Sequence, residues 1–302
     1  MKRPKSILIG SNGYLGRHLA FHLDKNNFEN HNFDLPMSAH PEINNYESLD
    51  VCKISDFDKL DPQADFIFMF AGLTGTADGF DRYGQFVEVN ELGLLNLLDW
   101  MRRAQCKARI VFPSTRLVYK GRKGHALKED DPKETRTIYA ANKLNAENIL
   151  WMYQNAFDID YTVFRICVPY GNLFDRKFSY GTVGFFISKA EAGQDISLYG
   201  DGLIGRSFTH VSDISGNIIT AIQSEKTKNE IYNIGGENLT LLELAQLVAK
   251  KYGVGIKFTD WPAMAYKLES DDTIFDDHKL CSTISIEYRY SIKDWIIEID
   301  IP

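Results

Sequence analysis

The sequence predicts an α/β protein with a doubly wound parallel sheet that is covered by helices on both faces. Short apolar runs typical of buried parallel strands recur along the chain, at residues 7–9, 66–70, 109–112 and 161–166. Segments with apolar residues at helical spacing separate these runs, and the first run leads through a glycine turn directly into a helix. Such sheets bind ligands at the carboxyl ends of their strands, so the motifs that follow the strands are the candidates for function.

The composition indicates a folded protein in a reducing compartment. Its 302 residues are 44% hydrophobic and 25% charged, which suits one large domain or a nucleotide-binding domain with a smaller companion. The net charge of −7 and the scattered basic residues argue against nucleic acid or an anionic membrane as a partner. Since neither a membrane-spanning run nor a signal peptide is evident, we expect a cytoplasmic protein. The cysteines fit no metal-ligand spacing, so we expect reduced thiols and no metal site: Cys52, Cys106, Cys167 and Cys281.

The glycine turn after the first strand predicts a dinucleotide site, with a turn that serves packing alone as the alternative. One glycine allows the tight bend, one lets the backbone approach a pyrophosphate, and one lets the helix pack on the strand. The N-terminus of the helix adds N–H donors and a partial positive charge. The glycines are spaced G-x-x-G-x-x-G, and the predicted cofactor contacts in the turn are Gly10, Asn12, Gly13, Tyr14, Leu15 and Gly16.

An acidic residue at the end of the second predicted strand favours NAD over NADP. Asp34 lies 18 residues beyond Gly16, where its carboxylate could accept hydrogen bonds from both hydroxyls of an adenosine ribose. The same carboxylate would repel a 2′-phosphate, and residues 35–37 include no arginine to relieve that repulsion. An ordinary surface aspartate is the alternative.

Three further segments are predicted to line the cofactor. Asp50, beside the apolar Val51, could accept a hydrogen bond from the amine of an adenine, although a lone aspartate in a loop is more often only solvated. Ala71 and Gly72 end an apolar strand, and their small size would let a cofactor lie across the strand edge. Asn90 lowers the helix propensity of an otherwise apolar helix, which indicates either close approach to the sheet edge or a tolerated surface position.

The chemistry of the sequence centres on Tyr139 and Lys143, which stand four residues apart on one face of a predicted helix. A tyrosine alone titrates near pH 10 and makes a poor base, but a lysine ammonium one turn away favours the phenolate. Thr115, at the end of a neighbouring strand, can hydrogen-bond the same substrate oxygen. Together these residues could transfer a proton between an alcohol and a ketone beside a hydride carrier. A Tyr-x-x-x-Lys pair is common by chance, and the motifs that precede it give it weight.

The chain resembles an extended short-chain dehydrogenase/reductase of the NAD-dependent epimerase/dehydratase family, whose members act on nucleotide-activated sugars. The resemblance implies a Rossmann domain over residues 1–166 and a mainly substrate-binding domain over 167–302, with parts near 206–236 returning to the Rossmann core. It implies Tyr139 as the acid/base and Lys143 as the group that holds the nicotinamide ribose. The matching motifs are Gly10-x-x-Gly13-x-x-Gly16, Asp34, Asn90-x-x-Gly93-x-x-Asn96, Ser114-Thr115, Val118-Tyr119, Tyr139-x-x-x-Lys143, Arg165, Tyr170-Gly171 and Arg206-x-Phe208-x-His210-Val211-x-Asp213.

The resemblance also implies a nucleotide-diphosphate sugar as the substrate. It places Thr115 at the sugar oxygen, Tyr199 near the nucleotide base and Arg206 near the diphosphate, where a guanidinium fits because it presents paired donors. A homodimer is implied as well, formed through the helix at 90–101 and the helix that carries Tyr139. The predicted substrate contacts are Ser114, Thr115, Tyr139, Asn172, Tyr199 and Arg206.

The departures from the family pattern narrow the reaction. Sugar 4,6-dehydratases place Asp-Glu directly after the threonine, and Arg116 and Leu117 stand there in this chain, so that dehydration is disfavoured. An epimerase and a 4-ketoreductase remain, both acting at a sugar hydroxyl or ketone, most simply at C4. Lys120 and Val168 also depart from the family and indicate a divergent substrate pocket. A non-catalytic NAD-binding scaffold or sensor is the alternative from another class.

Overall fold

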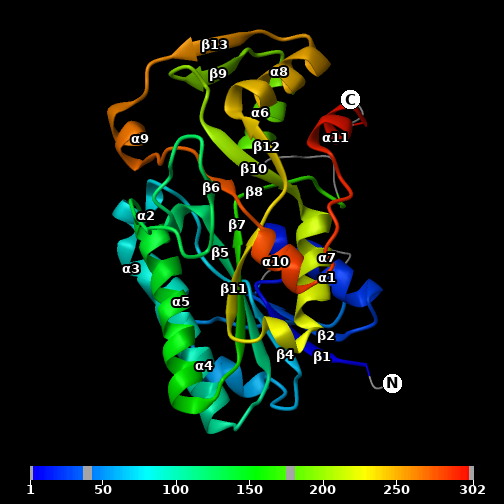
Figure 1. Ribbon diagram of the computed structural model, residues 1–302. Helices are drawn as coiled ribbons and strands as arrows, with labels where there is room; N and C mark the ends of the chain where they lie inside the picture. Colours follow the sequence, from blue (N-terminus) through cyan, green and yellow to red (C-terminus); the bar gives the residue numbers. More distant parts are fainter. Residues whose placement is uncertain (1–2, 37–42, 175–180, 299–302) are drawn as a thin grey trace.

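The computed structural model describes residues 3–36, 43–174 and 181–298, and it confirms the predicted fold class. All seven strands of the main sheet are parallel (Figure 1). They are β1 (Lys5–Ile9), β2 (Glu29–Asp34), β3 (Tyr46–Ser48), β4 (Phe66–Met69), β5 (Arg109–Thr115), β7 (Tyr161–Ile166) and β11 (Glu230–Ile234). The order across the sheet is β11-β7-β5-β4-β1-β2-β3, so the winding reverses between β1 and β4. A ligand crevice is expected at the carboxyl ends of these two strands.

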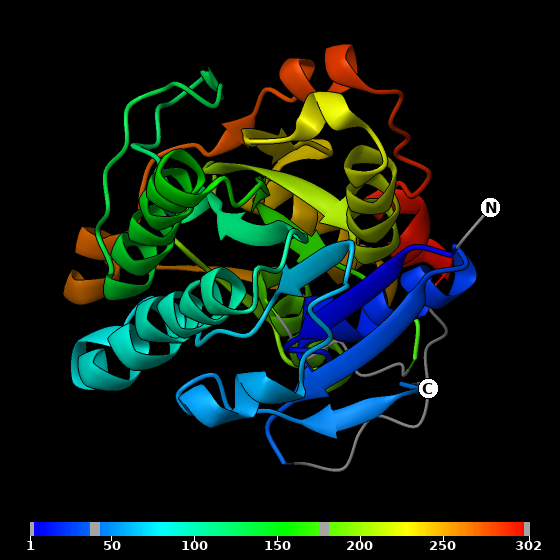
Figure 2. The same ribbon diagram turned by 90° about the horizontal axis from the view of Figure 1, so that it is seen from below.

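Helices cover both faces of the sheet because successive side chains of a strand point to opposite sides. Ile7 and Ile9 lie in the apolar core of one face, and Leu8 lies in the core of the other. The first core is covered by η1 (Ile54–Lys59), α4 (Gly93–Arg103) and α5 (Ile138–Phe157), and the second by α1 (Tyr14–Lys25), α7 (Val211–Ile222) and α10 (His278–Thr283). Figure 2 shows α4 and α5 side by side, seen along the sheet from below.

A smaller unit stands over the carboxyl ends of the strands, at the top of Figure 1. It has its own apolar core, and a capping box formed by Thr240 and Glu243 begins its helix α8 (Leu241–Tyr252). The unit consists of β8 (Val168–Tyr170), β10 (Gly205–His210), β12 (Glu237–Thr240), β9 (Ile196–Tyr199), β13 (Ile256–Thr259), α6 (Gly181–Glu191), α8 (Leu241–Tyr252), α9 (Ala263–Leu268) and α11 (Ile292–Glu298). The chain leaves this unit to form α7 and β11 of the larger one, so the two share segments of the C-terminal half.

Two local features differ from the sequence prediction. Tyr46–Ser48 forms the edge strand β3, which the sequence analysis does not include and which is too short to show an alternating pattern. The helix expected over 90–101 begins earlier, because α3 (Tyr83–Val87), a π-helical turn η2 (Glu88–Leu92) and α4 follow one another without a break. Met37, part of the sequence argument for NAD, lies outside the described residues. Among the residues the structure describes, every helix is too short or too polar to cross a membrane.

Candidate active site

The turn after β1 has two positions that only glycine can occupy. Gly10 has φ +96°, in the left-handed region, and a Cβ there would lie 2.3 Å from the backbone nitrogen of Ala71. A Cβ on Gly16 would lie 2.0 Å from the carbonyl oxygen of Gly10. The backbone of this turn therefore contacts both the residue pair after β4 and the first turn of α1. Tyr14 and Leu15 begin α1, with Leu15 packed against the core.

The residues around this turn fit a bound dinucleotide. Because the N-cap of α1 is Gly13, no side chain covers the first backbone N–H groups of the helix. The Ser11 hydroxyl is buried and has no hydrogen-bond partner among the described residues. The Asp34 carboxylate accepts hydrogen bonds from the backbone N–H groups of Asn12 and Leu35, both at 2.8 Å. Uncapped donors suit a pyrophosphate, and a carboxylate with remaining lone pairs suits a ribose.

Asp50 and Val51 lie in a loop that is fixed against α4. The Asp50 carboxylate accepts a hydrogen bond from the backbone N–H of Cys52 at 3.0 Å. The carbonyl oxygen of Val51 accepts one from the Asn96 side chain at 2.9 Å, and the Val51 side chain fills the space that a Cβ on Gly93 would need. This packing explains the small residue at position 93. The adenine contact expected of Asp50 and Val51 remains a prediction.

Asn90 is directed to the sheet edge by the π-helical turn η2, a kind of turn that is frequent at functional sites. Its side chain is buried and pairs with Leu73, accepting from the backbone N–H at 2.8 Å and donating to the carbonyl at 3.0 Å. A Cβ on Gly72 would lie 3.1 Å from Asn90 Oδ1 and 3.9 Å from Lys143 Nζ. The structure thus brings together three predicted site residues, Gly72, Asn90 and Lys143, from three different elements.

Tyr139 and Lys143 lie one turn apart on α5, as predicted. The helix begins at an N-cap threonine, Thr137, whose hydroxyl accepts a hydrogen bond from Ala140 N at 3.1 Å. Lys143 Nζ donates to the carbonyl oxygen of Pro113 at 2.8 Å and lies 6.0 Å from the centre of the Tyr139 ring. Burial lowers the pKa of Lys143 to about 7. The fully charged ammonium assumed from the sequence is therefore only about half populated at neutral pH in the ligand-free protein.

Ser114 and Thr115, at the end of β5, have different surroundings. The Thr115 hydroxyl accepts a hydrogen bond from Leu117 N at 3.3 Å and so caps the short helix η3 (Arg116–Val118). The Ser114 hydroxyl donates to Glu147, which also forms a buried ion pair with Arg165 at 2.6 Å. Ser114 therefore joins the strand to α5 through a core network, and the substrate contact expected of it remains a prediction.

A cavity of about 660 Å³ connects the sheet edge with the smaller unit. Residues from the loops after β4 and β5 line one part of it, and residues of α6, β9 and α9 line the rest. Most of the lining is apolar or carries a hydroxyl group. The lining residues are Thr76, Ala77, Arg116, Leu117, Gly181, Thr182, Phe185, Phe186, Ser197, Leu198, Tyr199, Leu241, Trp261, Pro262, Met264, Ala265, Leu268 and Glu269.

The structure places the predicted substrate residues at different distances from this cavity. Tyr199 lines it, 45% exposed, with its ring 5.1 Å from that of Trp261. Arg206 is only 2% exposed and its guanidinium forms an ion pair of 2.6 Å with Glu269, which itself lines the cavity. Asn172 accepts a hydrogen bond from Phe174 N at 3.0 Å, in the segment that follows β8. The burial of Arg206 and its pairing with Glu269 could not be inferred from the sequence pattern.

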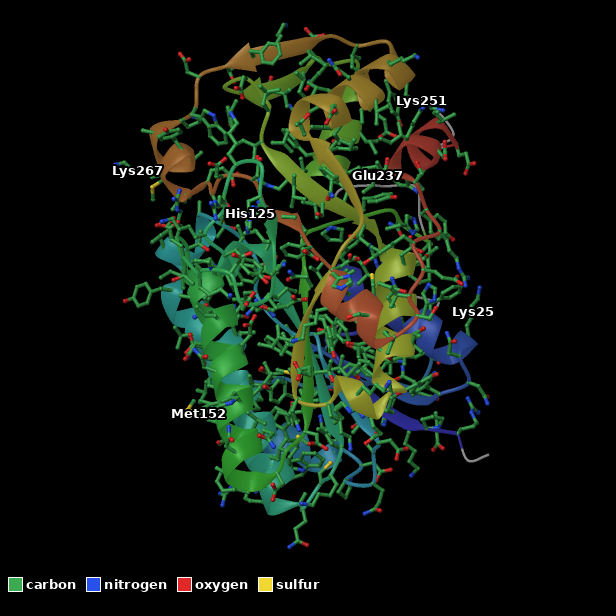
Figure 3. The ribbon with its side chains drawn as sticks, viewed as in Figure 1. Lys25, His125, Met152, Glu237, Lys251 and Lys267 are labelled. Carbon is green, nitrogen blue, oxygen red and sulfur yellow. The ribbon has the colours of Figure 1, made fainter. Side chains whose placement is uncertain are left out.

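Several residues of the site have no counterpart in the sequence analysis. Glu147 follows Lys143 by four residues on the same helix face, so helical spacing could have revealed it. Arg116 enters the sequence analysis only as a residue that cannot support dehydration, and the structure shows that it lines the cavity. Trp261 and the helix α9 reach the cavity from more than 60 residues after β9, and no local pattern signals that contact. Figure 3 shows Lys267 of α9 at the outer edge of this part of the protein.

Comparisons with known proteins agree with this geometry. A family model described as the NAD dependent epimerase/dehydratase family matches residues 6–235. A CDP-paratose 2-epimerase of Salmonella typhi is 26% identical over 259 residues, which make up 77% of this chain and 75% of that protein. A dTDP-glucose 4,6-dehydratase of Streptomyces niveus is 26% identical over 264 residues, 85% of this chain and 76% of that protein. The crystal structure of Thermus thermophilus UDP-glucose 4-epimerase in complex with NAD matches with a TM-score of 0.84 at 22% identity, covering 98% of this chain and 97% of that one.

Proposed function

The chain belongs to the NAD dependent epimerase/dehydratase family, as its motifs predict, and on that basis we propose that it is a nucleotide-sugar epimerase that acts at C4 of the sugar. The observation that supports the proposal is the arrangement at the carboxyl ends of β4 and β5, where Lys143 donates to the carbonyl of Pro113 and lies beside Gly72 and Asn90, one turn along α5 from Tyr139. This is where an open parallel sheet binds a dinucleotide. A 4-ketoreductase that makes a deoxysugar nucleotide is the second candidate, because it needs the same residues.

Tyr139 is proposed as the group that removes and returns the proton of the sugar hydroxyl. Thr115 orients that oxygen, and Lys143 stabilises the phenolate of Tyr139 while holding the nicotinamide ribose. Bound NAD supplies hydride acceptance and return at the adjacent carbon.

The cofactor is proposed to lie across the glycine turn, with its ribose at Asp34 and its adenine at Asp50 and Val51. The remaining contacts would come from Ala71, Gly72, Asn90 and Lys143, together with the turn residues Gly10, Asn12, Gly13, Tyr14, Leu15 and Gly16. We expect NAD to bind more tightly than NADP because the Asp34 carboxylate repels a 2′-phosphate. Replacing Asp34 with Ala should shift the ratio of the two dissociation constants toward NADP by about tenfold or more. Tighter binding of NADP by the wild-type protein would contradict the assignment.

The substrate is proposed to be a nucleoside diphosphate sugar that extends from the sheet edge into the cavity. Tyr199 would contact the base, Arg206 the diphosphate, and Ser114 and Asn172 would support the sugar end. The Arg206 guanidinium is paired with Glu269. It can therefore bind the diphosphate only if this ion pair opens, or if the guanidinium divides its N–H donors between Glu269 and the diphosphate. This is a specific cost that the sequence prediction did not include.

Dehydration at C4 and C6 is the less favoured reaction. Elimination of water needs an additional acid and base beside the sugar. The residues that follow Thr115 are Arg116 and Leu117, neither of which can exchange a proton in this pH range. The match to a dehydratase of Streptomyces niveus reflects the shared family and cannot by itself assign the reaction.

Mass spectrometry of the small molecules released from freshly purified, denatured protein tests the reaction class. Stoichiometric NAD or NADH is expected for an epimerase that retains its cofactor, and epimerisation of a nucleotide sugar by that protein should then be detected by NMR. A protein that is empty, and that consumes added NADH in the presence of a 4-ketosugar nucleotide, would be the reductase instead. Failure to bind any nicotinamide dinucleotide would contradict both assignments, and it would contradict an NAD-binding scaffold as well.

A homodimer is proposed through the outer faces of α4 and α5. Apolar side chains that a monomer would expose to water gather there, including Trp151 at 59% exposed and Met152 at 48%. Figure 3 shows Met152 on the outer side of α5, away from the sheet. Light scattering should give twice the 34.5 kDa mass of the chain, and replacing Trp151 with Glu should give the single mass.

A further inference from the structure

The cavity between the smaller unit and the loops after β4 and β5 has two charged side chains in its lining, Arg116 and Glu269. Arg116 directly follows Thr115, so it lies at the end of the cavity where β5 stops. Tyr199 and Trp261 line another part of the cavity, within the smaller unit. A positive side chain is therefore built into a cavity whose other lining residues are mostly apolar.

The two arginines beside Glu269 differ in how fully their donors are used. Arg206 is almost completely buried, and its guanidinium pairs with Glu269 at 2.6 Å. It also donates to the carbonyl oxygens of Gly205 at 2.8 Å and Asp271 at 3.0 Å. Arg116 approaches Glu269 only to 3.6 Å and Thr273 Oγ1 to 3.4 Å, and its side chain is 16% exposed. A guanidinium has five N–H donors, so Arg116 retains most of its capacity for a ligand in the cavity.

The charges around Glu269 favour an added anion. Arg116 and Arg206 share this one carboxylate, and the longer pair, at 3.6 Å, belongs to Arg116, whose charge is therefore the less closely paired of the two. Burial, and then repulsion from Arg116, lowers the pKa of Arg206 to about 10, which shows that the two guanidiniums interact. The neighbouring Asp272 accepts hydrogen bonds from the backbone N–H groups of Gly205 and Gly124, and its negative charge acts on Arg206. A second carboxylate, brought by a ligand, would complete the pairing of Arg116.

We propose that Arg116 determines specificity by binding a carboxylate on the sugar, so that the substrate is a nucleoside diphosphate uronic acid. The inference rests on the proposed function, which places the reacting sugar at Thr115 and Tyr139. Because Arg116 is the next residue after Thr115, its backbone lies at the proposed sugar end of the cavity, and its side chain lines the cavity beside Glu269. A planar guanidinium and a carboxylate can form two parallel hydrogen bonds, which selects a carboxylate over the neutral hydroxymethyl group of a hexose.

Calorimetric titration with matched probes tests the assignment. The probes are UDP, UDP-glucose and UDP-glucuronate, with the dTDP series run in parallel, since each sugar pair differs only at C6. The wild-type protein should bind the uronate at least about tenfold more tightly than the neutral sugar. Replacing Arg116 with Gln should abolish the preference for the uronate over the neutral sugar. Replacing it with Lys should keep part of this preference, because lysine retains the positive charge but lacks the planar guanidinium.

Arg136→Gln is the matched control. Arg136 also contacts Glu269, through the backbone carbonyl oxygen, but it is not among the residues that line the cavity. This variant removes one positive charge from the same neighbourhood and should keep the wild-type ratio of uronate to neutral sugar. An equal loss of the ratio in both variants would mean that general electrostatics, and not contact with Arg116, sets the preference, and would overturn the proposal.

The remaining outcomes separate this inference from the proposed function. If Arg116→Gln weakens UDP as much as UDP-glucuronate, Arg116 binds the diphosphate and the carboxylate assignment is wrong. If the wild-type protein epimerises a neutral nucleotide sugar and binds the uronate no better, the inference is wrong and the proposed function stands. If the wild-type protein binds none of the probes in either series, the inference is wrong, and the proposed function then depends on the test for bound nicotinamide dinucleotide.

Discussion

The sheet edge and the cavity of the smaller unit hold their side chains in different ways. At the sheet edge, Asn90, Thr115 and Lys143 are all buried, and each side chain is hydrogen-bonded to a backbone group. In the cavity, Tyr199 is 45% exposed and Met264 is 53% exposed, and the Tyr199 ring lies beside that of Trp261. Backbone groups of a sheet cannot move independently, whereas exposed side chains can change rotamer.

This difference suggests a division of labour. Proton transfer needs atoms fixed within a fraction of an ångström, and the sheet edge provides such a frame. Selection among ligands needs only the right groups within reach, which the cavity provides. Changes at the sheet edge should therefore alter turnover or stability, and changes in the cavity should alter affinity.

The largest effect is expected from Tyr139→Phe, which tests the sheet edge directly. Loss of the hydroxyl removes the group that moves the proton, so kcat should fall by about a thousandfold or more, while NAD binding is retained. Tyr153→Phe is the control, because it removes a hydroxyl from the same helix α5 without touching the site. Steady-state kinetics and calorimetric NAD titration measure the two properties. Turnover within tenfold of the wild type would remove Tyr139 from the mechanism.

The second-largest effect is expected on the free energy of unfolding, when the buried ion pair between Glu147 and Arg165 is broken. Glu147 and Arg165 are both 3% exposed at the side chain, and Glu147 also accepts from Ser114. Glu147→Gln leaves the Arg165 charge buried without its counter-ion, so the free energy of unfolding should fall by about 3 kcal/mol. Urea unfolding measures it. Asp99→Asn, which breaks the exposed pairs on α4, should leave the unfolding free energy nearly unchanged, and equal losses in both variants would show that burial does not matter here.

The same contrast explains what could be predicted from the sequence. Gly10, Gly16, Asp34 and the Tyr139–Lys143 pair were all recognisable because the strand, turn and helix that present them are local, with spacing set by backbone geometry. The apolar strands and the capping box of α8 were recognisable for the same reason.

The cavity could not be predicted in this way. Trp261 reaches Tyr199 only because β13 pairs with β9 across nearly 60 residues of chain. The pairing of Arg206 with Glu269 again joins distant segments, and the sequence offered no sign of it. The lowered pKa of Lys143 also depends on how completely the fold excludes water, a quantity that spacing does not encode.

That lowered pKa leads to a smaller, pH-dependent effect. Lys143 titrates near pH 7 when folded and at its ordinary 10.5 when unfolded, so between these values the unfolded chain binds more protons and stability rises with pH. From about pH 7.0 to 8.5 the unfolding free energy of the ligand-free wild type should rise by about 1.5 kcal/mol relative to Lys143→Met. Taking the difference between the two proteins cancels the contribution of Lys133, whose pKa burial lowers to about 8. Parallel stability curves would show that Lys143 is solvated and charged throughout.

The smallest effect is expected from a substitution in the cavity, which tests whether the cavity side chains alter affinity and not turnover. Tyr199→Ala removes an exposed ring beside Trp261, so KM for the nucleotide sugar should rise by about threefold to tenfold with kcat nearly unchanged. Tyr199→Phe keeps the ring and should keep KM, which separates stacking from the hydroxyl. A change in kcat without a change in KM would mean that the cavity side chains position the sugar as rigidly as the sheet edge does. The proposed difference, with turnover set at the sheet edge and affinity set in the cavity, would then be wrong.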